Sequence, residues 1–556
     1  MFTRGASRLI RRSASKYAAR KVNHLSFSQS RAYSFGEKFG SKNRGRVVVK
    51  GSLVAGGSVI ATIFGLSLFD FSDGDIPVKE VMKHNNPKDC WIVLNGKVYE
   101  VTSFLGQHPG GASRIMEVAG KDATARFHQV HSEKTLEKMK GHLVYVGKLK
   151  GKFENYATEE DLRIEDRKEK IPPLETIFCL SDFESVAKEV LPKTIFTFFA
   201  TGSSDEFSLR ENHYAYSRVF FRPRILQDIE PENIDTSTTF LGSKADLPIY
   251  VSGFAGSRLA HPLGEKNLQA AAYKYNMMQM VPKQNSFSPE EFYPDVPPDQ
   301  IQTQQYHFNE RKEIDEVDKL LEEWETHPTL KGYFFNVDLA DIGNREKDNK
   351  QRAKTVKENA GVDNIVDHRY GQYPKFTWED VERIVASTNR PVALKGVQRG
   401  EDVVIAAKKG VKAVVLSNTG GRQLDFSRPP LEVLVESRQM LKENNLEDKI
   451  ELYLDGGVRR GSDVVKALCL GATGVGLGIP FLYAMAGYGE EGASHLIEIL
   501  KEEIKNNMRL LGVEKIEDLN ESLVDYRGLN LRSKANDVLY DSAYEPLSFP
   551  EFKKDI

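Results

Sequence analysis

The sequence predicts two folded domains in series, an α+β domain at residues 75–150 and an α/β domain of the (β/α)8 barrel class at residues 176–545. The first observation behind this prediction is length, because a chain of 556 residues is too long to fold around one compact core. The second is a change from short mixed elements to a regular alternation of β-rich runs and longer helical stretches. The third is the strongly charged segment 151–175, which runs into two consecutive prolines and is typical of an interdomain hinge.

The overall composition is that of a soluble globular protein, with 40% hydrophobic residues, 28% charged residues and a formal net charge of −2. Nucleic-acid-binding domains usually carry an excess of basic residues, so no nucleic-acid partner is expected. The three cysteines, Cys90, Cys179 and Cys469, lie far apart and none stands in a CxxC pair. A disulfide framework and a structural zinc site are therefore not expected either.

Residues 1–33 predict a mitochondrial transit peptide. Residues 1–36 contain eight Lys and Arg residues and no acidic residue, and they are rich in serine, as import sequences are. The alternative is a basic tail with no targeting role. Within residues 34–74, the stretch 51–69 carries no charge over 19 residues, which is just long enough to cross a bilayer. We expect 51–69 to be a sorting signal or an inner-membrane anchor, which places the protein in the mitochondrial intermembrane space.

Two histidines mark the candidate site of the first domain. His108 precedes Pro-Gly-Gly at 109–111, a sequence that turns the chain sharply and lets the backbone approach a flat ligand. His131 follows 23 residues after His108. Two axial imidazoles suit a haem iron that transfers electrons, because they leave no position for oxygen. The alternatives are a structural histidine in a turn, or a metal pair formed by His128 and His131.

A resemblance bears on these alternatives. The segment WIVLNGKVYEVTSFLGQHPGGASRIMEVAGKDATARFHQVH resembles the cytochrome b5 family, and the likeness covers residues 75–150. It implies a cytochrome b5-like domain that holds haem b between His108 and His131. His128 would then be a bystander.

The barrel prediction depends on eight β-rich runs after residue 240, each followed by a longer amphipathic stretch. The runs are 248–254, 277–282, 303–308, 333–338, 391–396, 413–418, 450–457 and 474–478. Eight parallel strands favour a closed (β/α)8 barrel over a doubly wound sheet. The chemistry of such a barrel lies at the C-terminal ends of its strands, so polar residues there are the candidate site residues. Residues 546–556 are expected to form a C-terminal tail.

Polar and glycine-rich turns follow the last four runs. The fifth run ends in Lys395, the sixth in Ser-Asn-Thr-Gly-Gly-Arg at 417–422, the seventh in Asp-Gly-Gly-Val-Arg at 455–459 and the eighth in Gly-Leu-Gly at 476–478. Barrels commonly hold a phosphate on backbone N–H groups after strands seven and eight, and Arg459 adds a guanidinium. The pattern predicts a phosphate-bearing cofactor. The alternative is that the glycines only form tight turns.

A second resemblance rests on four segments: LKGVQR, VVLSNTGGRQLDFSRPP, LDGGVRRGSDVVKALCLGA and NVDLADIGNREKD. They resemble the FMN-dependent 2-hydroxy acid dehydrogenases and oxidases, and the likeness runs from about residue 180 to residue 544. With the haem domain in front, the chain is most similar to the L-lactate dehydrogenase (cytochrome) family, the flavocytochromes b2. This resemblance implies FMN and haem b as cofactors, oxidation of an L-2-hydroxy acid such as L-lactate, cytochrome c as electron acceptor, and a homotetramer.

The same resemblance assigns roles to residues. Lys395 falls on the lysine that stabilises reduced FMN, Arg422 on the arginine that binds the substrate carboxylate, and Asp338 on the acid that orients the catalytic imidazole. Arg345 falls on a second active-site arginine, and Tyr156 on a tyrosine near the haem. The flavin-binding positions are matched by Ala255, Gln305, Lys395, Asp455, Gly456, Gly457, Val458, Arg459 and Gly478.

The chain departs from the family at the catalytic histidine, where it has Thr419. A threonine hydroxyl has no useful basicity near neutral pH, and loss of a positioned general base typically costs about 10²–10⁴ in rate. His307 is a candidate substitute base, because it ends the third run and should face the same mouth; the alternative is a polar histidine on the rim. Further departures are Phe198 and His307 at two substrate-contacting tyrosines, Pro282 at a flavin-contacting serine, Asn336 at a threonine and Ile479 at a phosphate arginine.

Three hypotheses about function follow from these residues. The first is a flavocytochrome that oxidises an L-2-hydroxy acid through FMN and haem. The second is a haem-binding redox protein whose barrel has lost lactate chemistry, because the catalytic histidine position is Thr419. The third is a barrel that serves as a scaffold without redox chemistry. An absorption spectrum distinguishes them, since haem with flavin, haem alone and neither cofactor give different bands.

Overall fold

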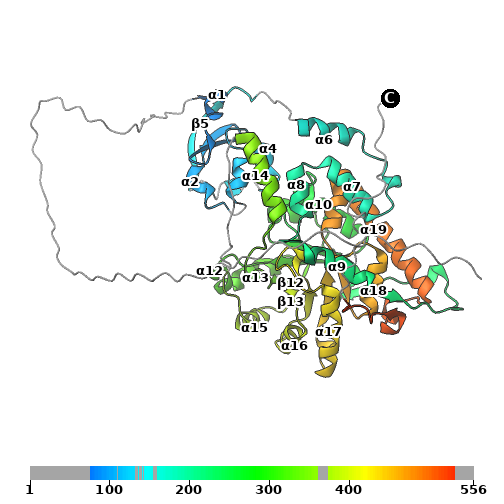
Figure 1. The fold of residues 1–556 in the computed structure, drawn as a ribbon. Coiled ribbons are helices and arrows are strands. Elements are labelled where there is room, and N and C mark those ends of the chain that lie inside the picture. The colour runs from blue at the N-terminus through cyan, green and yellow to red at the C-terminus, as the bar shows by residue number, and fades with distance from the viewer. Residues whose placement is uncertain are drawn as a thin grey trace, which may run out of the picture. The chain divides into compact units, whose positions relative to one another are not determined.

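The computed structural model describes residues 75–108, 111–131, 135–136, 139, 141, 143–153, 159–360 and 374–531, which Figure 1 draws in colour. The predicted transit peptide at 1–33, the segment 34–74, the tail at 546–556 and Tyr156 lie outside these residues. In the part of the chain that is described, no helix is long and apolar enough to span a bilayer. Cys90, Cys179 and Cys469 are free thiols.

A five-stranded sheet with short helices forms the first domain. The strand order is β1-β5-β4-β3-β2, with β1 parallel to β5 and the other pairs antiparallel. The elements are β1 Asp75–Pro77, α1 Val78–Val81, β2 Asn85–Asn86, β3 Asp89–Leu94, β4 Lys97–Glu100, α2 Thr102–Leu105, α3 Ala112–Met116, α4 Thr124–His128 and β5 Val144–Lys150. Successive side chains of β3 point to opposite faces, so Cys90, Ile92 and Leu94 enter one apolar core and Trp91 and Val93 enter another. The predicted α+β domain is confirmed.

Eight parallel strands close into a barrel in the order β10-β11-β12-β13-β14-β15-β16-β9. Their bounds are β9 Ile249–Val251, β10 Gln279–Pro282, β11 Gln302–Tyr306, β12 Leu330–Asn336, β13 Val392–Val397, β14 Ala413–Leu416, β15 Glu451–Asp455 and β16 Gly474–Leu477. Each strand overlaps one of the eight predicted runs, and the predicted (β/α)8 barrel is confirmed. His307 and Asp338, which the sequence analysis placed at the ends of strands, lie just after β11 and β12.

Both faces of the barrel strands are buried. In β14, Ala413 and Val415 belong to the apolar cluster inside the barrel, together with Tyr453 of β15. Val414 and Leu416 belong to the cluster between the strands and the surrounding helices. Burial on both faces explains why β14 is apolar at every position, whereas β11 is equally buried but carries Gln302, Thr303, Gln304 and Gln305.

An antiparallel hairpin of β7 (Thr238–Phe240) and β8 (Ser243–Ala245) precedes the first barrel strand. The Phe240 ring packs edge-on against Tyr250 and Tyr453, with ring centres 6.1 Å and 5.6 Å apart. Phe240 also lies against Gly474, the first residue of β16, where a Cβ would come within 2.1 Å of its ring. The hairpin therefore plugs the N-terminal end of the barrel, and the C-terminal end is left for the site.

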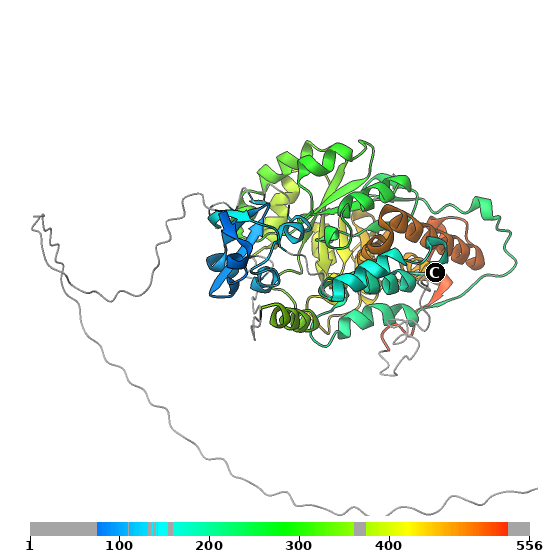
Figure 2. The same cartoon turned by 90° about the horizontal axis from the view of Figure 1, so that it is seen from above.

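Helices surround the strands (Figures 1 and 2). The helices between and after the strands are α10 Gly264–Lys274, α11 Pro289–Phe292, α12 Arg311–Asp315, α13 Val317–Glu325, α14 Glu346–Ala360, α15 Trp378–Ala386, α16 Gly400–Lys408, α17 Pro430–Glu443, α18 Gly461–Cys469 and α19 Ile479–Leu511. Before the barrel come α7 Leu180–Val190, α8 Lys193–Ala200 and α9 Phe207–Ser217, and β6 Phe220–Phe221 pairs with β17 Val524–Asp525. The Asn212 amide on α9 donates to the Asn418 side chain at 2.7 Å, which holds α9 against the turn after β14.

The charged segment 151–175, which the sequence analysis interpreted as an interdomain hinge, contains a helix, α6 (Glu159–Glu169). Three acidic residues lie in its first turn and two basic residues in its last turn, which suits the helix dipole. Arg163 donates to the Glu189 carbonyl at 2.7 Å, and the Glu160 carboxylate accepts from the Lys193 backbone at 2.8 Å. The helix was missed because charge placement, rather than an apolar period, stabilises it.

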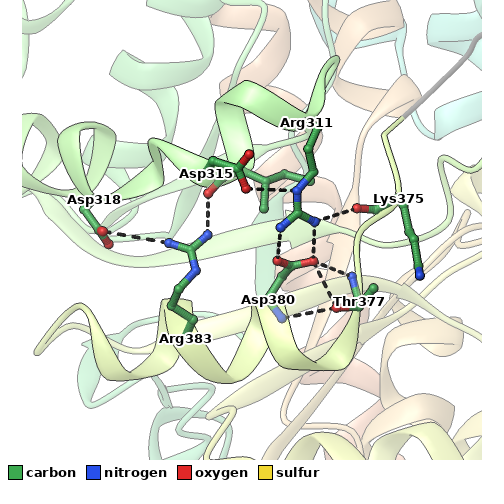
Figure 3. A network of polar contacts seen from close by, with 8 residues as sticks. Arg311, Asp315, Asp318, Lys375, Thr377, Asp380 and Arg383 are labelled. Atoms are coloured by element: carbon green, nitrogen blue, oxygen red, sulfur yellow. Dashed lines mark hydrogen bonds and ion pairs between the residues drawn. The ribbon is translucent and has the colours of Figure 1, made fainter.

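A polar network joins α12 to α15 on the outside of the barrel (Figure 3). The Arg311 guanidinium makes two 2.8 Å hydrogen bonds to the Asp380 carboxylate and a third, at 3.0 Å, to the Lys375 carbonyl. Asp380 also accepts from the Thr377 backbone N–H at 3.0 Å, while Thr377 caps the first turn of α15. The network therefore holds residues 375–380, at the start of α15, against Arg311 of α12.

Candidate haem and flavin sites

His108 and His131 face each other in the first domain. His108 follows α2 and its backbone N–H bonds the Phe104 carbonyl, while His131 follows α4 and bonds the Phe127 carbonyl. The ring centres are 6.1 Å apart and the ring planes are tilted by 48°. Imidazole nitrogens bind metal ions at about 2 Å, and each nitrogen is roughly 1 Å from its ring centre, so two rings sharing one ion have centres about 6 Å apart. The observed spacing matches one ion between the rings.

The hydrogen bonds of these rings also suit ligation. His108 Nδ1 lies 2.9 Å from the Gly111 carbonyl, which can only accept, so Nδ1 carries the proton and Nε2 is the ligating nitrogen. Burial and the neighbouring His108 lower the pKa of His131 to about 4, which keeps its imidazole neutral. His128 instead bonds the Asn95 side chain at 3.0 Å on the surface. The haem interpretation of His108 and His131 therefore fits better than a His128–His131 metal pair.

At the C-terminal end of the barrel, Lys395 of β13 is buried among hydroxyl and carboxylate groups. Its Nζ lies 3.1 Å from both the Asp455 carboxylate and the Ser417 hydroxyl. Burial alone would lower the pKa of Lys395, but the carboxylates of Asp455 and Asp338 outweigh burial and raise it. Lys395 is therefore a fixed positive charge, as its predicted role beside a reduced flavin requires.

Thr419 and Asp338 are hydrogen-bonded to each other in the turns after β14 and β12. The Thr419 hydroxyl donates to Asp338 Oδ2, and the Thr419 backbone N–H donates to the Ser417 hydroxyl at 2.9 Å. Thr419 has a φ of 51°, a left-handed conformation that is unusual for a β-branched residue. Burial raises the pKa of the Asp338 carboxyl, although Lys395 and the Thr419 hydrogen bond oppose the rise. Asp338 has a hydroxyl partner where the family resemblance places an imidazole.

The two predicted substrate arginines contact the C-terminal end of α8. Arg422 donates from Nη1 to the Gly420 carbonyl at 2.8 Å and from Nη2 to the Phe199 carbonyl. Arg345 donates to the Phe198 carbonyl at 3.4 Å, and its guanidinium lies 5.0 Å from the centre of the Phe198 ring. A carboxylate that binds these guanidinium groups would compete with backbone carbonyls of α8.

The predicted phosphate end of the site retains one guanidinium. Arg459 lies 2.5 Å from the Glu184 carboxylate and 3.2 Å from the Ser181 hydroxyl, both on α7. Ile479 begins α19 directly after Gly478 and brings no charge to that helix N-terminus. The close approach of α9 requires glycine at position 457, because a Cβ there would lie 2.2 Å from the Asn212 carbonyl oxygen. Arg459 would have to share its charge between Glu184 and a phosphate.

The remaining predicted residues lie around the same mouth of the barrel. The Gln305 amide donates to the Asn336 side chain at 2.8 Å across the ends of β11 and β12. Burial and the charge of Lys283 lower the pKa of His307 to about 4, so its ring is a weak proton acceptor near neutral pH. Pro282 ends β10, and Ala255 follows β9 in the chain.

Ser417 is a site residue that the sequence analysis named only as part of a turn. Its hydroxyl contacts Lys395 and accepts from the Thr419 backbone, and it donates to the Asp455 carboxylate at 2.5 Å. Ser252 at the end of β9 approaches the same carboxylate at 3.4 Å. The sequence signal for this role is the single hydroxyl of Ser417, which directly follows the apolar strand β14.

Comparison with known proteins identifies both domains. Residues 77–150 match the cytochrome b5-like heme/steroid binding domain, and residues 187–526 match the FMN-dependent dehydrogenase family. The chain is 40% identical to L-lactate dehydrogenase (cytochrome) of Wickerhamomyces anomalus, over 98% of either chain. It is 43% identical to the same enzyme of Saccharomyces cerevisiae, over 87% of this chain and 85% of that one.

Solved structures agree with the sequence relatives. The flavin-binding domain of baker's yeast flavocytochrome b2 superposes with a TM-score of 0.62 and 44% identity, over 72% of this chain and 100% of that one. The residues found here fit the two cofactors, because Lys395 is a buried cation at the barrel mouth and the two facing histidines have the spacing of axial ligands. The chain therefore belongs to the FMN-dependent dehydrogenase family, in the branch of the L-lactate dehydrogenases (cytochrome), and is an oxidoreductase with FMN and haem as cofactors.

Proposed function

We propose that this chain oxidises a small L-2-hydroxy acid such as L-lactate at the barrel mouth and passes the electrons through haem b to cytochrome c. The observation that carries the proposal is the convergence of Lys395, Asp338, Arg345 and Arg422 at one end of the barrel. A buried cation, a carboxyl group and two guanidinium groups are the groups that bind and oxidise a hydroxy acid anion.

The residues of the two sites have separate roles in this reaction. Arg422 and Arg345 bind and orient the substrate carboxylate by exchanging their hydrogen bonds to α8 for bonds to the substrate. Lys395 holds a positive charge close to where negative charge develops during oxidation. FMN, when bound, supplies an acceptor for two electrons that can release them singly. His108 and His131 would hold the haem as a one-electron carrier with no open iron position.

A second candidate function is a haem-binding electron carrier whose barrel no longer oxidises hydroxy acids. Two observations favour it. Thr419 stands where the family resemblance places the general base, and Ile479 stands where it places a phosphate arginine. Neither side chain replaces the lost basicity or charge.

Location and assembly are part of the proposal. The basic, acid-free residues 1–33 and the uncharged stretch 51–69 support import into mitochondria and sorting to the intermembrane space, with 51–69 removed or retained as an inner-membrane anchor. The family relationship supports a homotetramer. Fractionation of mitochondria and N-terminal sequencing of the mature chain test the location, and sedimentation tests the assembly.

The function is tested by anaerobic stopped-flow mixing of the full chain, loaded with haem and FMN, with L-lactate. We expect slow but stoichiometric bleaching of the flavin followed by reduction of the haem, and no reduction with D-lactate. Arg422→Met should abolish the response at the same substrate concentration, because it removes the carboxylate anchor. Haem and flavin bands that stay oxidised with L-lactate and other L-2-hydroxy acids would favour the electron carrier.

A further inference from the structure

The hydrogen-bonded pair of Thr419 and Asp338 has the arrangement of a proton relay. A hydroxyl donates one hydrogen bond and accepts others at the same time. The Thr419 hydroxyl donates to Asp338 Oδ2 and so keeps its lone pairs for a second donor at the barrel mouth. The backbone N–H of Thr419 is held by Ser417 at 2.9 Å, which fixes the turn that presents this hydroxyl.

The surroundings of Asp338 suit a group that gains and loses a proton. Its Oδ1 is buried and has no hydrogen-bond partner among the residues described. Burial raises the pKa of the carboxyl, Lys395 and the Thr419 hydroxyl lower it, and the negative charge of Asp455 raises it again. Lys395 pairs directly with Asp455, at 3.1 Å, so part of its charge is already neutralised. A carboxyl whose pKa is raised toward neutral pH is a better general base than an ordinary one.

We propose that Asp338 accepts the proton of the substrate hydroxyl group and that Thr419 relays it, a role that rests on the proposed oxidation of an L-2-hydroxy acid. The substrate O–H proton passes to Thr419 Oγ1 while the Thr419 proton passes to Asp338 Oδ2. FMN, when bound, would accept the C2 hydrogen together with the electron pair of the C2–H bond. The C2–O bond becomes a carbonyl, so the substrate leaves as a 2-oxo acid and its hydroxyl proton stays on Asp338.

His307 is the competing base at the same mouth. Burial and Lys283 lower the pKa of its imidazole to about 4, so it binds a proton weakly near neutral pH. Its backbone carbonyl accepts from Lys283 Nζ at 2.8 Å, which keeps that positive charge beside the ring. Burial instead raises the pKa of Asp338, although Lys395 and the Thr419 hydrogen bond oppose the rise, so its carboxylate binds a proton more strongly than an ordinary one.

The test uses the full chain with both cofactors and five variants, one of which is His307→Ala, which removes the competing base. Thr419→Val keeps the side-chain shape and removes the hydroxyl, Thr419→Ser keeps the hydroxyl, and Asp338→Asn keeps the shape and removes the acceptor. Thr239→Val, on the exposed side of β7 at the opposite end of the barrel, is the matched control. One readout is the rate of flavin reduction by L-lactate against pH. The other is the infrared carbonyl band of protonated Asp338, assigned by subtraction of the Asp338→Asn spectrum.

We expect Asp338→Asn to lower the rate by about 10²–10⁴ and Thr419→Val by about 10². Thr419→Ser, which keeps the relay hydroxyl, should lower it much less than Thr419→Val, and Thr239→Val should leave it unchanged. Thr419→Val should also move the titration of the Asp338 band to higher pH, because the lost hydrogen bond lowers the pKa of this carboxyl in the original chain. Equal haem and flavin content in all variants shows that each has folded.

The outcomes separate the relay from the function on which it rests. A Thr419→Val chain with unchanged rate and unchanged titration would overturn the relay and leave hydroxy acid oxidation standing. Loss of activity in His307→Ala but not in Asp338→Asn would assign the base to His307 instead. If the original chain binds FMN and no L-2-hydroxy acid reduces it, the proposed function and the relay both fall.

Discussion

The haem site and the barrel mouth of this chain differ in how completely they retain the chemistry of their families. At the haem site the two predicted ligands, His108 and His131, face each other with ring centres 6.1 Å apart, and the bond to Gly111 that selects the tautomer of His108 is in place. At the barrel mouth all eight strands are in order, yet Thr419 and Ile479 stand where the family resemblance places a base and a phosphate arginine. A fold rests on many dispersed apolar contacts, whereas a reaction rests on a few polar atoms, so a barrel can persist while its chemistry changes.

The strongest test of this comparison removes one haem ligand. His108→Ala and His131→Ala should each abolish the bis-imidazole haem spectrum, because one remaining imidazole leaves an open iron position. Flavin absorbance should be unaffected, since the barrel has its own core. The measurement is the ratio of haem to flavin bands in the purified full chain.

His128→Ala is the control for the haem variants, because its ring bonds Asn95 on the surface and lies outside the facing pair. Haem content and coordination should be unchanged in this variant. An unaltered spectrum in either ligand variant would show that the facing pair does not hold the iron.

The second test restores the missing base. Thr419→His should raise the rate of flavin reduction by L-lactate by about 10² or more, because a positioned imidazole beside Asp338 supplies general base catalysis. Position 419 has a left-handed backbone conformation, with a φ of 51°, and a histidine there keeps part of the strain that Thr419 has. Folding of Thr419→His should therefore be checked by its haem and flavin content. A rate equal to that of the original chain would mean that the proton transfer step does not limit this barrel.

How far the sequence predicts this molecule depends on whether a feature is local. A barrel strand such as β14 was predictable because burial on both faces makes it a continuous apolar run. Lys395 was predictable as a polar residue at the end of a predicted run, whereas Asp338 was assigned through the family resemblance. The contacts of Arg422 with Phe199 and of Arg459 with Glu184 were not, because they join residues more than 200 positions apart. The helix α6 was missed for a different reason, since it is stabilised by the charges at its two ends and by the long-range hydrogen bond that the Glu160 carboxylate accepts from the Lys193 backbone N–H.

The third test addresses the phosphate end of the barrel. Ile479→Arg places a guanidinium at the start of α19, next to Gly478 and apart from the Arg459–Glu184 pair. A hydrogen bond to a charged group contributes about 1.5–3 kcal/mol, which corresponds to at least about a tenfold lower Kd for FMN. Fluorescence titration of flavin-free chain with FMN measures the change.

Leu510→Arg, near the far end of α19, is the control for the added charge because its side chain is exposed. The Kd for FMN should not change in this variant. Equal affinities in the two arginine variants and the original chain would argue that the phosphate does not approach the start of α19.

The smallest expected effect concerns the scaffold alone. Thr377→Ala removes the cap of α15 and one contact of the Asp380 carboxylate that Arg311 holds (Figure 3). Loss of a threonine N-cap typically costs about 1 kcal/mol, so the urea midpoint of the barrel should fall slightly. Flavin reduction should be unaltered, because the network lies on α12 and α15 outside the barrel mouth.

Thr326→Ala is the control, because it removes a hydroxyl at the C-terminal end of α13 instead of a helix N-cap. It should shift the urea midpoint less than Thr377→Ala. A change in flavin reduction without a change in stability would show that α15 is coupled to the site, and the separation of scaffold from chemistry drawn here would then be too strict.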